Sequence, residues 1–113
     1  MKFPNKVKIG YAEYNIKDWN GLEASRESRY GDFDHERLTI RIGDGVPDPV
    51  RASVLIHEIF HGIVQHFNVP VGEKEEEIVT AMSEGMSQVM CDNQGLIDWI
   101  QKAIENKKSK RKK

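Results

Sequence analysis

A His-Glu-x-x-His motif inside an apolar stretch of helical length constrains this chain more than any other feature. It reads His57-Glu58-Ile59-Phe60-His61. Residues four apart lie on one face of an α-helix, so His57 and His61 point toward a common position. Imidazole nitrogens are preferred ligands of Zn²⁺, and a glutamate directly after the first histidine lies where it takes a proton from a metal-activated water. The motif therefore predicts a zinc site with Glu58 as general base.

The helix that carries the motif is predicted to begin at Asp48-Pro49 and to end at Asn68-Val69-Pro70. An aspartate caps the first turn, and proline fits the first helical position. The apolar residues between these signals recur at spacings of one, three and four, which is typical of a broad apolar face. They are Val54, Leu55, Ile59, Phe60, Ile63, Val64 and Phe67. The two histidines border this face, so we expect them to be substantially buried.

Alternating apolar residues before the helix predict strands. One strand region covers Lys6 to Asp18, with Gly10 as a bulge or a hairpin turn, and a second covers Leu38 to Ile42. The segment Asp34–Arg37 is predicted to be a hairpin loop between two antiparallel strands. Residues 22–29 are highly charged and fit either a short helix or a loop.

Two further amphipathic segments follow the motif helix. The first is predicted to be a helix from Glu73 to Asp92, and Asn93-Gln94-Gly95 interrupts the chain after it. The second is a short helix from Leu96 to Ile104. The expected fold class is therefore α+β, with a small antiparallel β-sheet followed by a zinc-binding helix and one or two further helices.

The distribution of charge separates a short tail from the rest of the chain. A chain of 113 residues fits a single domain, which we assign to residues 1–105. Residues 106–113 hold 6 of the 17 basic residues and none of the 18 acidic ones, which leaves residues 1–105 with 11 − 18 = −7. We expect this tail to be disordered, with a weak nucleic-acid contact as the alternative. It has no aromatic residues for stacking on bases.

Composition also indicates where the chain works. No apolar run approaches the roughly 18–20 residues that span a bilayer, and no apolar segment follows the N-terminal lysines as it does in a secretion signal. The only cysteine is Cys91, so an internal disulfide is excluded. We therefore expect a cytoplasmic protein without a membrane partner.

A catalytic zinc site needs a third protein ligand besides two histidines. His66 lies five residues after His61, off the shared face of the helix, and is interpreted either as a solvated histidine or as one that interacts with the helix dipole at the C-terminus. The other candidates are glutamates on the next helix: Glu73, Glu75, Glu76, Glu77 and Glu84. Helical phase favours Glu77, because the apolar residues Ile78, Ala81 and Met82 follow it at positions one, four and five. Glu76 remains the alternative.

From Lys6 to about Gln94, the chain resembles the small zincin-like metallopeptidases of phages and prophages. These are similar to ImmA/IrrE-type and minimal gluzincin domains. The resemblance rests on the strands before the motif, on His57-Glu58-Ile59-Phe60-His61, and on the order Glu77-Ile78-Val79-Thr80-Ala81-Met82. It implies that a glutamate of the next helix is the third zinc ligand. Gluzincins often place an acidic residue four positions after that glutamate, where this chain has Ala81.

The predicted activity is hydrolysis of peptide bonds by a zinc metallopeptidase with ligands His57, His61 and Glu77. The expected substrate is a peptide or protein segment in extended form, added along Leu38–Ile42 as an edge strand. Tyr30 and His35 are candidates by position for stabilising the transition state. The alternative is a non-catalytic zinc-binding regulatory or interaction protein of phage or prophage origin. Glu58 favours the enzyme, because a purely structural zinc site needs no general base.

Overall fold

The computed structural model describes residues 3–20 and 30–111, the last five of these as backbone alone, so the unassigned segment 22–29 lies outside the described residues. The described part contains a four-stranded sheet and three α-helices, which confirms the α+β fold class. The elements in chain order are β1 (Lys6–Ile9), β2 (Ala12–Trp19), β3 (Gly31–Asp34), β4 (Thr39–Gly43), α2 (Asp48–Phe67), the 3-10 turn η1 (Gly72–Lys74), α3 (Glu75–Asp92) and α4 (Leu96–Arg111).

The sheet is mixed, and the expectation of a purely antiparallel sheet is wrong. Its order is β1-β2-β4-β3. Each hairpin is antiparallel, with Gly10 at a positive φ of 61° in the first turn, but β2 and β4 pair in parallel. Turn residues determine pairing within a hairpin. They do not determine how two separate hairpins lie against each other, and here β4 pairs in parallel with β2.

This order also corrects the predicted edge strand. Leu38–Ile42 was expected at the edge, but β4 lies between β2 and β3. The edge strands of the described sheet are β1 and β3. In the second hairpin, which consists of β3 and β4, β3 is therefore the strand whose outer side has backbone groups that pair with no other strand of the described sheet.

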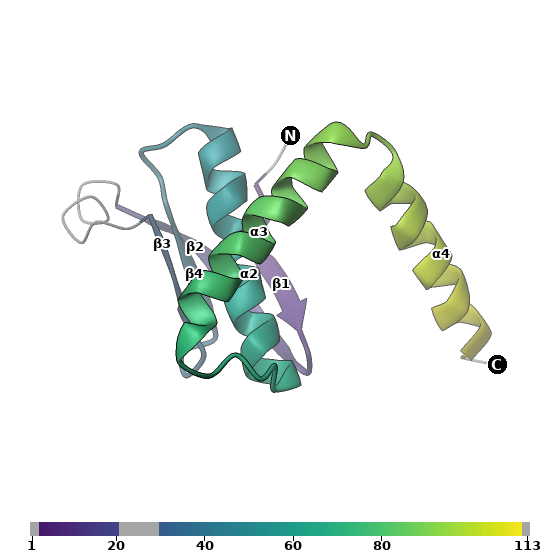
Figure 1. Cartoon of the computed structure of the whole chain (residues 1–113), viewed down its shortest axis with the longest axis horizontal. Coiled ribbons are helices and arrows are strands. Elements are labelled where there is room, and N and C mark those ends of the chain that lie inside the picture. Colours follow the sequence, from purple (N-terminus) through teal and green to yellow (C-terminus); the bar gives the residue numbers. More distant parts are fainter. Residues whose placement is uncertain (1–2, 21–29, 112–113) are drawn as a thin grey trace.

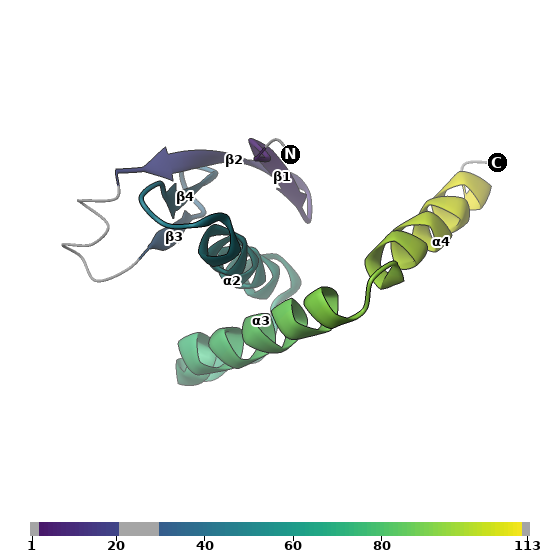
Figure 2. The ribbon, with the colours of Figure 1, turned by 90° about the horizontal axis from the view of Figure 1, so that it is seen from above.

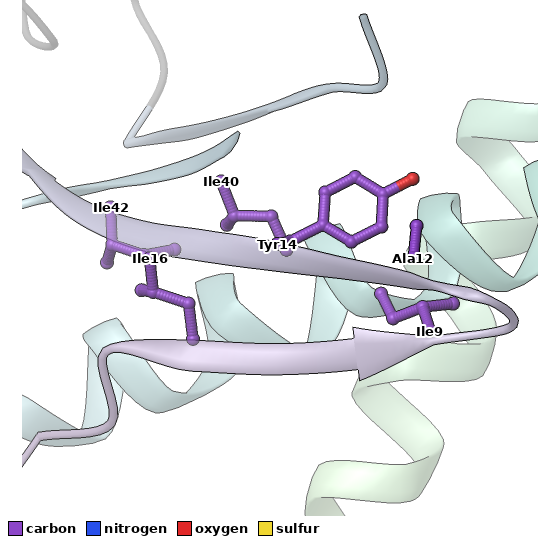
Figure 3. Packing of buried hydrophobic residues seen from close by; sticks show 6 residues of the cluster. All are labelled: Ile9, Ala12, Tyr14, Ile16, Ile40 and Ile42. Atoms are coloured by element: carbon purple, nitrogen blue, oxygen red, sulfur yellow. The ribbon is translucent and has the colours of Figure 1, made fainter. Parts of the chain in front are cut away.

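The core lies between one face of the sheet and α2 (Figure 3). Alternate residues of β2 point to this face, as the sequence pattern predicts. Burying each aliphatic side chain here stabilises the fold by about 1.5–3 kcal/mol. The buried cluster consists of Ile9, Ala12, Tyr14, Ile16, Ile40 and Ile42, and α2 packs Val54, Leu55, Ile59 and Ile63 against it.

The elements form three layers. α2 lies between the sheet and α3, as Figures 1 and 2 show together, and it contacts β1, β3, β4 and α3. Asn68 follows α2 as its C-cap, where it adopts a left-handed conformation and donates its backbone N–H to Val64 O. Among the described helices, none has the length and apolar character to cross a membrane.

α4 projects away from the sheet and from α2 in both views. It extends to Arg111, so the helix continues into the basic segment that was expected to be disordered from residue 106. Lysine and arginine are good helix formers and are favourable near a helix C-terminus, which explains why the basic segment extends the helix rather than ending it.

Candidate metal centre

A groove runs along α2 between β3 and α3. It encloses about 860 Å³. β3 and the residue before it form one wall with Tyr30, Gly31, Asp32 and Phe33. α3 forms the other wall with Glu75, Glu76, Thr80, Ser83, Glu84 and Ser87. The floor belongs to α2 and carries both motif histidines and Glu58.

The two motif histidines point toward each other across one turn of α2. Their Nε2 atoms are 3.2 Å apart, and their side chains are 23% and 18% exposed for His57 and His61. They are thus partly buried rather than deeply buried, because they lie on the floor of an open groove. Helical spacing of four accounts for their convergence.

Glu76 completes this group of possible ligands. Its Oε1 lies 2.9 Å from His57 Nε2 and 3.1 Å from His61 Nε2. Within the part of the chain that the structure describes, His57, His61 and Glu76 form the one group of this kind able to hold a metal ion. Glu77 is exposed and lies outside the group, so the geometry favours the alternative ligand Glu76 over Glu77.

The phase of α3 explains this difference. The buried residues of α3 are Val79 and Ser83, three and seven residues after Glu76. Such spacings put Glu76 on the face that packs toward α2. Ile78 and Met82, which hydropathy places on the core face, are exposed. Ile78 and Met82 thus misidentified the inner face of α3, which carries Val79 and the small polar residue Ser83.

The donor atoms of the group fit Zn²⁺. Zinc with ligand distances of about 2.0–2.1 Å in a tetrahedron places neighbouring ligand atoms roughly 3.3 Å apart. The three donor atoms are separated by 2.9, 3.1 and 3.2 Å. Two imidazole nitrogens and one carboxylate are a ligand set that zinc accepts, with the groove as the open side of the centre.

Glu75 lies behind His61. Its Oε2 is 2.7 Å from His61 Nδ1, so it accepts the ring N–H and fixes Nε2 as the nitrogen that faces the group. A carboxylate in this position also makes the ring a stronger ligand. The position where an orienting acid was expected holds Ala81, and nothing in the spacing of the motif identifies Glu75.

His61 and Glu76 stabilise each other's charged forms. Burial disfavours the charged form of His61, but its hydrogen bonds to Glu75 and Glu76 outweigh this and raise the pKa of His61. Burial also acts to raise the pKa of Glu76, but its hydrogen bonds to His57 and His61 outweigh this and lower it. In the metal-free protein, these shifts favour a protonated His61 beside an ionised Glu76. A divalent cation bound by both residues would take the place of the proton on His61.

Glu58 is the most buried acid at the groove, with 6% of its surface exposed. Burial is the main cause that raises its pKa to about 6, against the lowering effect of His57 and His61. A Cβ atom added to Gly31 would lie 3.4 Å from Glu58 Oε2, so the edge strand passes close to the carboxylate. Glu58 therefore lies at the floor of the groove, beside the possible metal ligands His57, His61 and Glu76.

Of the two residues considered for the transition state, only Tyr30 lines the groove. His35 belongs to a separate cluster. The hydroxyl of the buried Tyr14 lies 2.8 Å from His35 Nδ1 and 2.7 Å from His66 Nε2. A hydroxyl has one proton, so it donates to one ring and accepts from the other. His66 is therefore held in this cluster, which ties α2 to the sheet. It lies in the last turn of α2, as expected for a histidine at the helix C-terminus, but it is half-buried rather than solvated.

Comparisons with known proteins do not assign the chain to a family. The chain matches no known protein family, no curated protein and no solved structure at a significant level.

Proposed function

We propose that this protein is a zinc-dependent metallopeptidase. The observation that carries the proposal is the convergence of His57 Nε2, His61 Nε2 and Glu76 Oε1 beside the buried Glu58, in a groove bordered by the edge strand β3. A bound Zn²⁺ would supply a Lewis acid that polarises the scissile carbonyl and makes water acidic near neutral pH.

Glu58 has the position and the environment of a general base. It adjoins His57 and His61, and its pKa of about 6 in the metal-free protein lies close to neutral pH. A base of this kind accepts the proton of the attacking water and delivers it to the leaving nitrogen. Glu75 would hold His61 in the orientation that binding requires.

β3 suggests how the substrate is held. It is an edge strand and forms one wall of the groove, so its free backbone groups can pair with an extended segment of a peptide or protein. Pairing with the substrate is therefore assigned to β3 and not to Leu38–Ile42, because Leu38–Ile42 lies inside the sheet. An extended chain paired with β3 would lie in the groove that holds His57, Glu58 and His61.

The test compares Glu58→Gln with Glu84→Gln, which removes a charge from the same groove. Each zinc-loaded protein is incubated with a library of peptides, and new termini are counted by mass spectrometry. We expect Glu58→Gln to keep its zinc and to lose a factor of about 10²–10⁴ in cleavage rate, because the general base is gone. Glu84→Gln should cleave at a rate close to the unchanged protein. Cleavage by zinc-loaded Glu58→Gln at the full rate would exclude this mechanism. Bound zinc without any cleavage would favour the regulatory alternative.

A further inference from the structure

α4 has an exposed apolar face that packs against neither the sheet nor α2. Its residues Ile97, Ile100 and Ile104 are spaced by three and four, as on one face of a helix, and all three are exposed. Trp99 is 69% exposed. The helix points away from the sheet and from α2 in both views (Figures 1 and 2). Exposed apolar residues that gather on one face of a helix are typical of an interaction site.

α3 has a second apolar stripe beside the face that packs on α2. Ile78, Met82, Met86 and Met90 recur every four residues, and all are exposed. The buried residues Val79 and Ser83 are each one position further along, about 100° around the helix axis. The stripe therefore lies next to the buried face and is left uncovered by α2.

The two helices carry opposite charges at opposite ends. The chain has acids at Glu73, Glu75, Glu76 and Glu77, at and just before the beginning of α3. The last turns of α4 include Lys107, Lys108, Lys110 and Arg111. An antiparallel pairing of α4 with α3 brings these ends together, whereas a parallel pairing of two α4 helices would bring two basic ends together.

We propose that the chain forms a two-fold symmetric dimer in which α4 of each copy lies antiparallel on the exposed stripe of the other copy's α3. The lengths agree. The stripe from Met82 to Met90 spans about 12 Å, and Ile97 to Ile104 spans about 10 Å, at 1.5 Å per residue. With Ile104 beside Met82 of the second copy, Arg111 lies seven residues after Ile104 and Glu75 lies seven residues before Met82, so the two charges meet at the same end of the pairing. Apolar and charged positions thus match in a single register.

A second copy of the chain would cover the exposed apolar faces and also pair the charged helix ends. Under two-fold symmetry each copy presents both an acidic and a basic end, so both ends are paired twice. An anionic membrane surface would attract the end of α4 but repel residues 1–105, whose net charge is −7.

The first test measures mass in solution by sedimentation equilibrium. At micromolar concentrations we expect twice the 13.0 kDa of one chain. Met86→Lys and Ile100→Lys should each weaken the dimer tenfold or more, because each puts a charge into the apolar contact. Val69→Lys is the matched control, since Val69 and Met86 are both 38% exposed and Val69 lies outside both helices. Circular dichroism verifies that each variant is folded.

The second test determines the register by cross-linking between copies in a Cys91→Ser background. Mixed Met90→Cys and Ile97→Cys chains should form a disulfide readily, and mixed Met90→Cys and Ile104→Cys chains should not. Removing residues 107–113 should weaken the dimer in low salt and have little effect in 1 M salt, because salt screens the charges. A monomer at all concentrations, a dimer unaffected by Met86→Lys, or association only with anionic vesicles would overturn the proposal.

Discussion

At the scale of single residues, Glu75 determines which nitrogen of His61 faces the proposed metal site. Its carboxylate accepts the Nδ1 hydrogen at 2.7 Å. We predict that Glu75→Ala weakens zinc binding by about 10–100-fold, the usual effect of removing a group that orients a ligand. Competition with a chromophoric chelator measures this affinity. Glu73→Ala removes a neighbouring exposed acid and should leave the affinity unchanged; equal affinities for the two variants would contradict the role of Glu75.

Glu58 makes the stability of the metal-free protein depend on pH. Its pKa is raised from 4.5 to about 6 on folding, so the folded state binds the proton more tightly. Its ionisation therefore destabilises the fold: the penalty is absent below pH 4.5, grows as the pH rises from 4.5 to 6, and is complete above pH 6. The corresponding free energy is about 2 kcal/mol.

We predict that metal-free Glu58→Gln is more stable than the unchanged protein by about 2 kcal/mol at pH 8, because the buried charge is gone. The difference should vanish near pH 4. Urea unfolding at both pH values, with Glu77→Gln as the exposed control, measures it. A difference that is the same at both pH values would show that ionisation of Glu58 is not its cause.

The residues of the site were accessible to sequence reasoning to different degrees. His57, Glu58 and His61 follow from one spacing rule, because all three lie within two turns of one helix. The third ligand depends on which face of α3 is buried. That face carries Val79 and Ser83 rather than the apolar stripe, so hydropathy indicated Glu77 where the fold presents Glu76.

At the scale of elements, the position of α2 against the sheet depends on Gly31 of β3. A Cβ atom there would overlap Val54 Cγ1 of α2 and would lie 3.0 Å from Arg41 O. Val54 has a β-branched, stiff side chain, and the second neighbour is backbone, so neither can move away easily. The absence of a side chain at residue 31 allows the edge strand to approach the helix that carries the motif.

We predict that Gly31→Ala destabilises the protein by about 1–3 kcal/mol through overpacking between β3 and α2. Thermal or urea unfolding measures the change. Gly85→Ala in α3 is the control, because a Cβ atom at Gly85 meets nothing within 4 Å, and alanine favours a helix. If Gly31→Ala were as stable as Gly85→Ala, the close contact between strand and helix would be refuted.

The elements were largely predictable because their signals are local. Alternation in β2, the hairpin loop before β4 and the helix signals around α2 all operate within a few residues. The parallel pairing of β2 with β4 joins segments more than twenty residues apart, such as Asn15 and Thr39. No turn signal encodes such a pairing, and the edge strand was misplaced for the same reason.

At the scale of the whole molecule, the metal group connects the layers. His57 and His61 come from α2, and Glu76 comes from α3, which the chain reaches only through η1. A metal bound by all three would link the helix that packs on the sheet to the helix that closes the groove. Zinc should therefore stabilise the fold in proportion to its occupancy, by about 2.7 kcal/mol at a hundredfold excess over the dissociation constant.

The zinc content of purified Glu76→Ala and Glu77→Ala, measured by mass spectrometry of the metal, tests the metal centre most directly. Each variant removes one acid from the first turn of α3, and only Glu76 lies within hydrogen-bonding distance of both motif histidines. We predict one zinc ion per chain in the unchanged protein and in Glu77→Ala, and loss of zinc in Glu76→Ala. Zinc retained in Glu76→Ala and lost in Glu77→Ala would contradict the centre described above.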